Sequence, residues 1–200
     1  MIAVLDYGIG NLRSAQKALE KVGAEAVLTA DPAVVEAATG VVLPGVGHVG
    51  RCLEALRHSG LEEPAKAAID AGTPFIGICV GMQMLYDGSE EAPDVKGMGV
   101  LPGVVRLLPD TVKRPQMQWN VLEHRPTPML AGMDDPVWMY FVHSYAPEMS
   151  DAVGATCDYG GPVVAAVVQD NVWATQFHPE KSGAAGLRLL RNFVASVPGD

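Results

Sequence analysis

The first half of the sequence alternates short apolar runs with stretches of helical periodicity, and this alternation limits the possible folds more than any other feature. The runs that predict strands are 2–6, 25–28, 41–43 and 75–79, and the periodic stretches that predict helices are 11–22, 49–56 and 62–71. Strands separated by helices are typical of a parallel sheet with helices on both faces. The first half therefore predicts an α/β fold with a mostly parallel central sheet.

From about residue 97 the sequence changes character and becomes rich in valine, proline, glycine and aromatic residues. Strand patterns here fall at 104–108, 137–142, 163–168 and 172–176, and a last helical pattern covers 183–197. They predict an antiparallel or mixed extension of the sheet. Because no repeat or long linker divides the chain, we expect a single domain over residues 1–200.

Composition and charge exclude several classes of function. The chain has 14 basic and 23 acidic side chains, and its formal charge of −9 argues against binding to nucleic acid or to an anionic membrane surface. No apolar run approaches the roughly 20 residues of a membrane span. Met1 leads directly into the first predicted strand, without the pattern of a secretion signal. We therefore expect a cytoplasmic protein with no membrane contact.

The sharpest local feature is the segment GICVG at residues 77–81, which places Cys79 between two glycines. It follows an apolar strand and precedes a helix, so it has the form of a nucleophile elbow with cysteine in place of serine. Such a turn exposes the sulfur above the sheet, and the positive end of the next helix favours the thiolate. The alternative is a small buried cysteine in an ordinary turn.

The other two cysteines, Cys52 and Cys157, are widely spaced from Cys79, and the total of three is odd. This spacing disfavours a disulfide framework or a zinc site, so we expect neither a metal nor another cofactor. Each of these two cysteines is either buried packing or a reactive thiol.

A cysteine nucleophile needs a histidine that is close in space. The five histidines are His48, His58, His124, His143 and His178. His178 is the best candidate because it follows an apolar strand, Pro179 fixes the backbone after it, and Glu180 lies two residues on. In an extended segment residues two apart point the same way, so Glu180 would orient the imidazole. The alternative is a surface turn with a solvated carboxylate.

Together, the cysteine elbow and the late HPE at residues 178–180 resemble the class I (triad) glutamine amidotransferases. Within that family the chain looks most like the glutaminase subunits of imidazole glycerol phosphate synthase, from histidine biosynthesis. The matching segments are 6–11 (DYGIGN), 44–47 (PGVG), 77–83 (GICVGMQ), 140–145 (YFVHSY) and 178–182 (HPEKS). The resemblance implies a flavodoxin-like core and hydrolysis of glutamine by Cys79, His178 and Glu180.

The resemblance also assigns supporting residues. The backbone N–H of Val80, at the start of a helix, is one expected oxyanion donor, and the family places a second in the PGVG segment, at Val46 or Gly47. The residues expected to hold glutamine are Gly47, Gln83, Ser144 and Tyr145. The implied partner is a (β/α)8-barrel cyclase that receives ammonia and makes imidazole glycerol phosphate and an aminoimidazole ribonucleotide. Candidates for contact with it are Asn11, Trp119 and Lys181.

One segment departs from the family pattern. Where the family has proline, histidine, methionine, glycine, tryptophan and asparagine, this chain reads PQMQWN at residues 115–120, with Gln116 and Gln118 in the histidine and glycine positions. No member of the catalytic triad changes. The substitutions leave open the shape of this loop and its coupling to the partner.

Three other interpretations compete with this one. The first is a glutaminase subunit for pyridoxal phosphate or anthranilate synthesis, against which the HSY and HPEKS strings argue. The second is the related group of cysteine hydrolases and chaperones, which place histidine directly after the cysteine where this chain has Val80. The third is a non-catalytic regulatory subunit on the same fold, against which the intact Cys79, His178 and Glu180 argue.

Overall fold

The computed structural model describes residues 1–198 and is organised around an eight-stranded sheet in the order β2-β1-β3-β4-β13-β12-β11-β8. Its strands are β1 (Ile2–Leu5), β2 (Ala26–Thr29), β3 (Gly40–Gly45), β4 (Phe75–Cys79), β8 (Glu123–His124), β11 (Val153–Asp158), β12 (Pro162–Gln169) and β13 (Val172–Thr175). From β2 to β13 neighbouring strands are parallel, and from β13 to β8 they are antiparallel. The expected α/β fold with a mostly parallel sheet and an antiparallel extension is confirmed.

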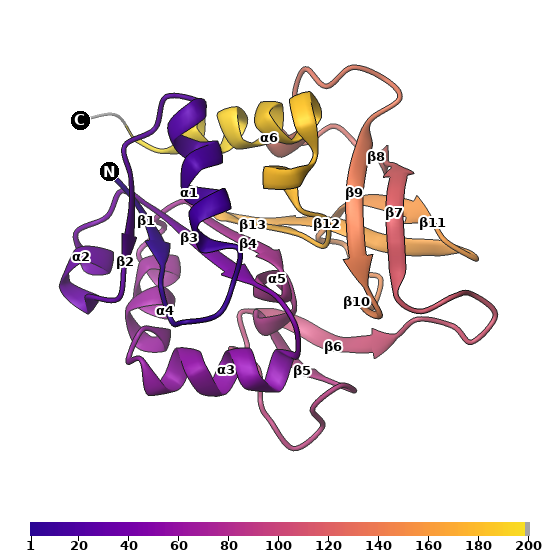
Figure 1. Ribbon diagram of the computed structural model, residues 1–200, viewed down its shortest axis with the longest axis horizontal. Coiled ribbons are helices and arrows are strands. Elements are labelled where there is room, and N and C mark those ends of the chain that lie inside the picture. Colours follow the sequence, from indigo (N-terminus) through magenta and orange to yellow (C-terminus); the bar gives the residue numbers. More distant parts are fainter. Residues whose placement is uncertain (199–200) are drawn as a thin grey trace.

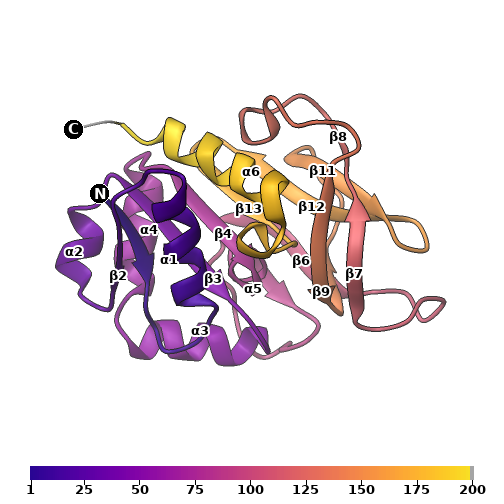
Figure 2. The ribbon, with the colours of Figure 1, turned by 45° about the horizontal axis from the view of Figure 1, so that its top comes forward.

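Helices cover both faces of the parallel part (Figure 1). The helices are α1 (Leu12–Lys21), α2 (Pro32–Glu36), α3 (Val49–His58), α4 (Glu62–Asp70), α5 (Val80–Met84) and α6 (Gly183–Ser196). Helices α1 and α6 pack together on one face, and α3 and α4 lie on the other, as Figure 2 shows from a second side. Strands β1, β3 and β4 are buried at every position because both of their faces are covered.

Two smaller sheets complete the second half. One has the order β10-β6-β5 and the other pairs β7 with β9. Their strands are β5 (Tyr86–Ser89), β6 (Leu101–Leu107), β7 (Gln116–Val121), β9 (Trp138–His143) and β10 (Tyr145–Pro147), and the 3-10 turns are η1 (Pro128–Leu130) and η2 (Pro179–Lys181). The β7–β9 ribbon stands beside the end of the main sheet (Figure 1). Within residues 1–198 no helix is long and apolar enough to cross a membrane.

The structure refines the expected elements and corrects one of them. The strand expected at 172–176 is β13, where the sheet becomes mixed, because it pairs in parallel with β4 and antiparallel with β12. The segment 115–120 is largely the strand β7 and not a loop, since it pairs with the apolar strand β9. The sequence reading also missed α2, a short helix whose signal is Asp31, which caps Ala33 N–H at 3.0 Å, followed by Pro32 at its first position.

Strand register brings the chemistry-bearing loops to one edge of the sheet. Gly45, at the end of β3, is paired with Cys79, at the end of β4. On the other side of β4, Thr175 of β13 is paired with Ile78, so the chain that leads to His178 emerges beside the elbow. In a parallel sheet the carboxyl ends of the strands are where ligands bind.

Candidate active site

Cys79 is held in a conformation that side chains rarely adopt. Its φ is +57°, and helix α5 begins at the next residue, Val80. Backbone strain of this kind costs roughly 1–3 kcal/mol and persists only when the surroundings enforce it. The elbow expected from the sequence is therefore present as a strained turn between strand and helix.

The glycines of the elbow are required by close backbone contacts. A Cβ on Gly81 would lie 1.9 Å from the carbonyl oxygen of Leu43 on β3, and one on Gly77 would lie 2.9 Å from the carbonyl oxygen of Gly81. A Cβ on Gly45 would lie 2.6 Å from the nitrogen of Gly81. Three backbone segments thus touch directly, and this contact fixes the elbow against β3.

His178 lies where β13 has ended and the turn η2 begins, and only 1% of the residue is exposed. Its Nδ1 is 2.7 Å from Glu180 Oε1, and both side chains are almost completely buried. The expected pairing is present, but the route to it differs from the expectation. Pro179 starts a 3-10 turn and does not continue an extended segment, so the turn brings Glu180 back to the ring. Glu180 Oε2 is buried and has no hydrogen-bond partner among residues 1–198.

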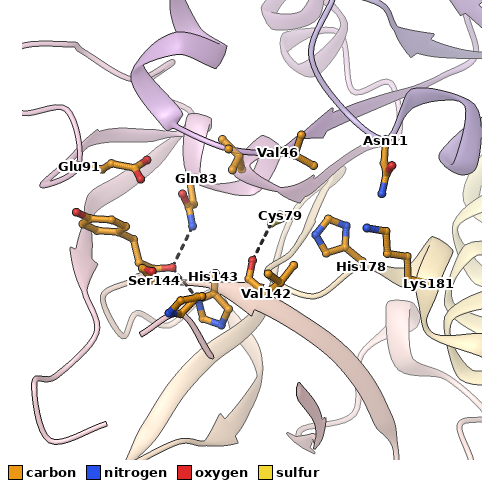
Figure 3. Close-up of a pocket in the computed structure, with 14 residues that line it drawn as sticks. Asn11, Val46, Cys79, Gln83, Glu91, Val142, His143, Ser144, His178 and Lys181 are labelled. Atoms are coloured by element: carbon orange, nitrogen blue, oxygen red, sulfur yellow. Dashed lines mark hydrogen bonds between the residues drawn. The ribbon is translucent and has the colours of Figure 1, made fainter. Parts of the chain in front are cut away.

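Cys79 and His178 line the same cavity, whose volume of about 460 Å³ is in the range of small-molecule sites (Figure 3). Residues singled out from the sequence that also line it are Asn11, Val46, Gly47, Val80, Gln83, Ser144, Tyr145 and Lys181. Figure 3 shows Glu91 and Ser144 on one side of Cys79 and Asn11 and Lys181 on the other. Trp119 lies outside this cavity, on strand β7, with 47% of the residue exposed.

Comparison with known proteins shows the family of the chain. The family model of glutamine amidotransferase class-I matches residues 3–197. Imidazole glycerol phosphate synthase subunit HisH of Syntrophotalea carbinolica is 48% identical, over 96% of this chain and 98% of the relative. HisH of Methanothermobacter thermautotrophicus is 49% identical, over 98% of this chain and 99% of the relative. The chain belongs to the HisH family of class I glutamine amidotransferases.

Solved structures extend the likeness to the fold. The structure of PurLQS from Thermotoga maritima covers 98% of this chain with a TM-score of 0.79 at 21% sequence identity. A crystal structure of a glutamine amidotransferase covers 96% with a TM-score of 0.74 at 22% identity. Membership of the HisH family decides among the glutaminase subunits that the sequence left open, because 96–98% of this chain matches HisH.

The two buried histidines of this HisH-family chain are in opposite electrostatic states. Burial lowers the pKa of His178, but Cys79 and Glu180 outweigh it and raise the pKa to about 9. Burial and the neighbouring His178 lower the pKa of His143 to about 4. His178 is therefore an imidazolium near neutral pH, whereas His143 is a neutral ring whose Nδ1–H donates to the carbonyl of Tyr145 at 2.8 Å.

Gln116, which stands where the family pattern has histidine, lies in the core beside His143. Gln116 is fully buried, with its Oε1 placed 3.0 Å from His143 Nε2 and its Nε2 placed 3.6 Å from Cys157 Sγ. Because the neutral ring carries its proton on Nδ1, its Nε2 can only accept, so the amide satisfies the ring when it is turned over and its NH2 faces His143. Burial raises the pKa of the Cys157 thiol to about 11, so the thiol stays protonated and can donate to the amide oxygen. Gln118 is exposed.

The segment 44–47 is tied down by two residues that the sequence reading did not assign. The Tyr7 hydroxyl donates to the carbonyl of Pro44 at 2.5 Å, and the Cys52 thiol donates to the carbonyl of Val46 at 3.3 Å. Burial raises the pKa of both groups, so each remains a donor. Gly47 follows with a φ of +82°, a left-handed conformation that favours glycine.

Sequence reasoning missed two polar residues of the site. Glu91 lines the cavity and its Oε2 accepts from the N–H of Val49 at 2.7 Å. Gln176 is fully buried and its Nε2 lies 3.8 Å from Cys79 Sγ. For Gln176 a signal existed, since a polar residue ends an apolar strand two positions before His178. Glu91 stands in an acidic stretch with no local pattern that sets it apart.

Proposed function

We propose that this protein hydrolyses glutamine with Cys79 as the nucleophile. The thiolate attacks the side-chain amide carbon, and a carbon–sulfur bond forms. The His178 imidazolium gives its proton to the departing nitrogen, so the carbon–nitrogen bond breaks and ammonia leaves. The neutral imidazole then takes a proton from water, which attacks the thioester and releases glutamate. Glu180 holds the ring in the tautomer that this exchange needs.

One observation carries this proposal. A cysteine on a strained elbow and a histidine with a raised pKa open onto the same cavity, and the histidine is bonded to a buried carboxylate. Strongly shifted pKa values next to a nucleophile are typical of catalytic sites. An imidazolium at neutral pH is the form needed to balance a thiolate and to protonate a leaving amine.

The shape of the cavity supports glutamine as the substrate. Its Glu91 end offers a carboxylate, which suits the α-ammonium group of an amino acid, with Ser144 and Tyr145 close by for the α-carboxylate. Gln83, whose NH2 already donates to the Tyr145 carbonyl and to Gln176, would contact the substrate through its amide oxygen. A glutamine bound this way directs its side-chain amide toward Cys79. Ammonia would then leave on the far side, toward Asn11 and Lys181.

We propose the N–H of Val80 as one oxyanion donor because it begins helix α5 directly after Cys79. A second donor would come from Val46 or Gly47, which line the cavity across from the sulfur. One such donor is worth roughly 3 kcal/mol of barrier. The Cys52 thiol holds the carbonyl of the Val46–Gly47 peptide. A partner that favours a donating orientation of this peptide over the held one would accelerate the reaction.

We further propose that the ammonia passes to a (β/α)8-barrel cyclase in a heterodimer that makes imidazole glycerol phosphate. The support is that the relatives are named as subunits of imidazole glycerol phosphate synthase. Lys181 and Asn11 line the cavity on the side away from Glu91, and the exposed side chains of Met117, Trp119 and Trp138 form an apolar strip on the β7–β9 ribbon. Such a strip suits a protein interface.

The test is a glutaminase assay of the wild type and of Cys79→Ala, alone and with a cyclase subunit from a HisH-bearing relative. We expect the wild type to be slow alone and faster with the cyclase and its nucleotide ligand. Cys79→Ala should lose at least roughly 1000-fold in kcat under both conditions. Cys157→Ala is the matched control, a buried cysteine outside the cavity, and should retain activity. Substantial glutamine hydrolysis by Cys79→Ala would refute the proposal.

A further inference from the structure

Gln176 stands at the carboxyl end of β13, between the strand and the motif that holds His178. Its backbone N–H donates to the carbonyl of Ala165 at 2.8 Å, and no part of the residue is exposed. Its side-chain amide bridges Cys79 of the elbow and Gln83 of helix α5. Gln83 Nε2 is 3.0 Å from Gln176 Oε1, and Gln176 Nε2 is 3.8 Å from Cys79 Sγ.

The direction of these bonds follows from a group that can only accept. The backbone carbonyl of Tyr145 accepts from Gln83 Nε2 at 3.0 Å, so the nitrogen of the Gln83 amide must face that way. The same nitrogen has a second hydrogen, which points at Gln176. The oxygen of Gln176 must therefore face Gln83, and its NH2 group must face the sulfur. The carbonyl of Tyr145 thus fixes the orientation of both amides.

The sulfur stands between two groups with opposite preferences. The carbonyl of Val142 lies 4.0 Å from Cys79 Sγ and can accept from the protonated thiol. The NH2 group of Gln176 can only donate to sulfur, and a thiolate accepts a hydrogen bond far better than a thiol. Among residues 1–198 the sulfur is the one hydrogen-bond partner of this NH2 group.

We propose that Gln176 is a further catalytic residue, which donates an N–H to Cys79 Sγ and stabilises the thiolate independently of His178. The inference rests on the proposed role of Cys79 as the nucleophile. Its contribution is greatest when the sulfur is an anion, before attack on the amide and again when the thioester is hydrolysed and the thiolate leaves. Gln83, which the cavity offers to the substrate, is also the residue that holds this donor in place.

The experiment compares Gln176→Met with Gln116→Met in the full-length protein. Both replace a fully buried glutamine by an unbranched side chain without a donor, but only Gln176 contacts Cys79. The rate of Cys79 alkylation by iodoacetamide is followed by mass spectrometry of its peptide as a function of pH. We expect the midpoint of this profile to rise by about one pH unit in Gln176→Met, with a roughly tenfold loss of kcat and a smaller change in KM. Gln116→Met should leave the alkylation midpoint unchanged.

A second variant keeps the inference testable if Gln176→Met does not fold. Gln176→Glu keeps an oxygen for Gln83 and directs a carboxylate at the sulfur in place of the donor, so the alkylation midpoint should rise further than in Gln176→Met. Thermal unfolding shows which variants are folded. An unchanged midpoint in a folded Gln176 variant, or an equal shift in Gln116→Met, would overturn the inference. Alkylation needs no glutamine turnover, so such a result would leave the proposed function standing, whereas activity of Cys79→Ala would refute both.

Discussion

The two walls of the cavity are built from different parts of the polypeptide. The wall that carries Cys79 comes from β3, β4 and α5, where backbone touches backbone at three glycines. The wall that carries His178 comes from β9, β13 and η2, where buried side chains bond to one another and to carbonyl groups. The first positions its sulfur by shape, and the second positions its imidazole by hydrogen bonds.

Because the two walls are held in different ways, substitutions in them should have different effects. Close backbone contact leaves no room for a new atom, so a change at a glycine of the first wall acts on folding. A lost hydrogen bond in the second wall leaves the backbone in place and changes the protonation or position of a side chain. Substitutions in each wall test this difference.

The largest effect is expected at Gly81. A Cβ there would lie 1.9 Å from the carbonyl oxygen of Leu43, a backbone atom of β3 that can move only with its strand. Gly81→Ala should lower the free energy of unfolding by about 3 kcal/mol or more, measured by urea denaturation. Gly88→Ala is the control, because no atom lies within 4 Å of its Cβ position. Equal stability of the two variants would show that the elbow does not depend on this contact.

The next largest effect is on activity, in the other wall. His178→Gln should lower kcat by roughly 100-fold or more because the proton donor is lost, with little loss of stability at pH 9 and above. His143→Asn keeps an N–H in the place of the ring Nδ1–H and should act mainly on KM, since His143 supports the carbonyl of Tyr145. Steady-state glutaminase kinetics distinguish the two. A greater loss of kcat in His143→Asn would mean that the base has been wrongly chosen.

The smallest effect is a pH dependence of stability. Since the pKa of His178 rises from 6.5 to about 9 on folding, the folded state holds this proton more tightly than the unfolded state does. The His178 proton therefore adds on the order of 3 kcal/mol to the free energy of unfolding. This stabilisation is fully present below about pH 6.5 and is lost as the pH rises through 9. The free energy of unfolding should therefore decrease from about pH 6.5 to about pH 9, which urea denaturation at a series of pH values would measure. His178→Gln should flatten the curve, and a wild-type curve already flat in this range would contradict the raised pKa.

Much of the fold follows from local patterns. The apolar runs and helical periods of the first half predict β1, α1, β2, β3, α3, α4 and β4 to within a few residues, because the helices bury one face and the central strands β1, β3 and β4 are buried throughout. After β4 the chain is less readable, since β5, β7, β8, β10 and β11 are short or carry polar residues. Their pairing partners lie far along the chain, and nothing in the local pattern identifies them.

The same division holds for the candidate site. The elbow is visible in the sequence because its constraint is local, two glycines around a cysteine between a strand and a helix. Glu91 and Gln176 were not found, because their roles depend on what lies opposite them in the fold. The pairing of Glu180 with His178 was expected for a wrong reason, since the contact is made by a 3-10 turn and not by an extended segment.

By itself the sequence determined the parallel core, the elbow at Cys79 and the family to which the chain belongs, because short-range periodicity and motif spacing record those features. Only the tertiary structure decided which histidine is charged and which is neutral, because burial and the nearest charges set those pKa values. It also decided which way each buried amide points, since a carbonyl from a strand more than sixty residues away in sequence accepts from Gln83. Local patterns place a nucleophile, but the electrostatics around it come from residues that meet only when the chain has folded.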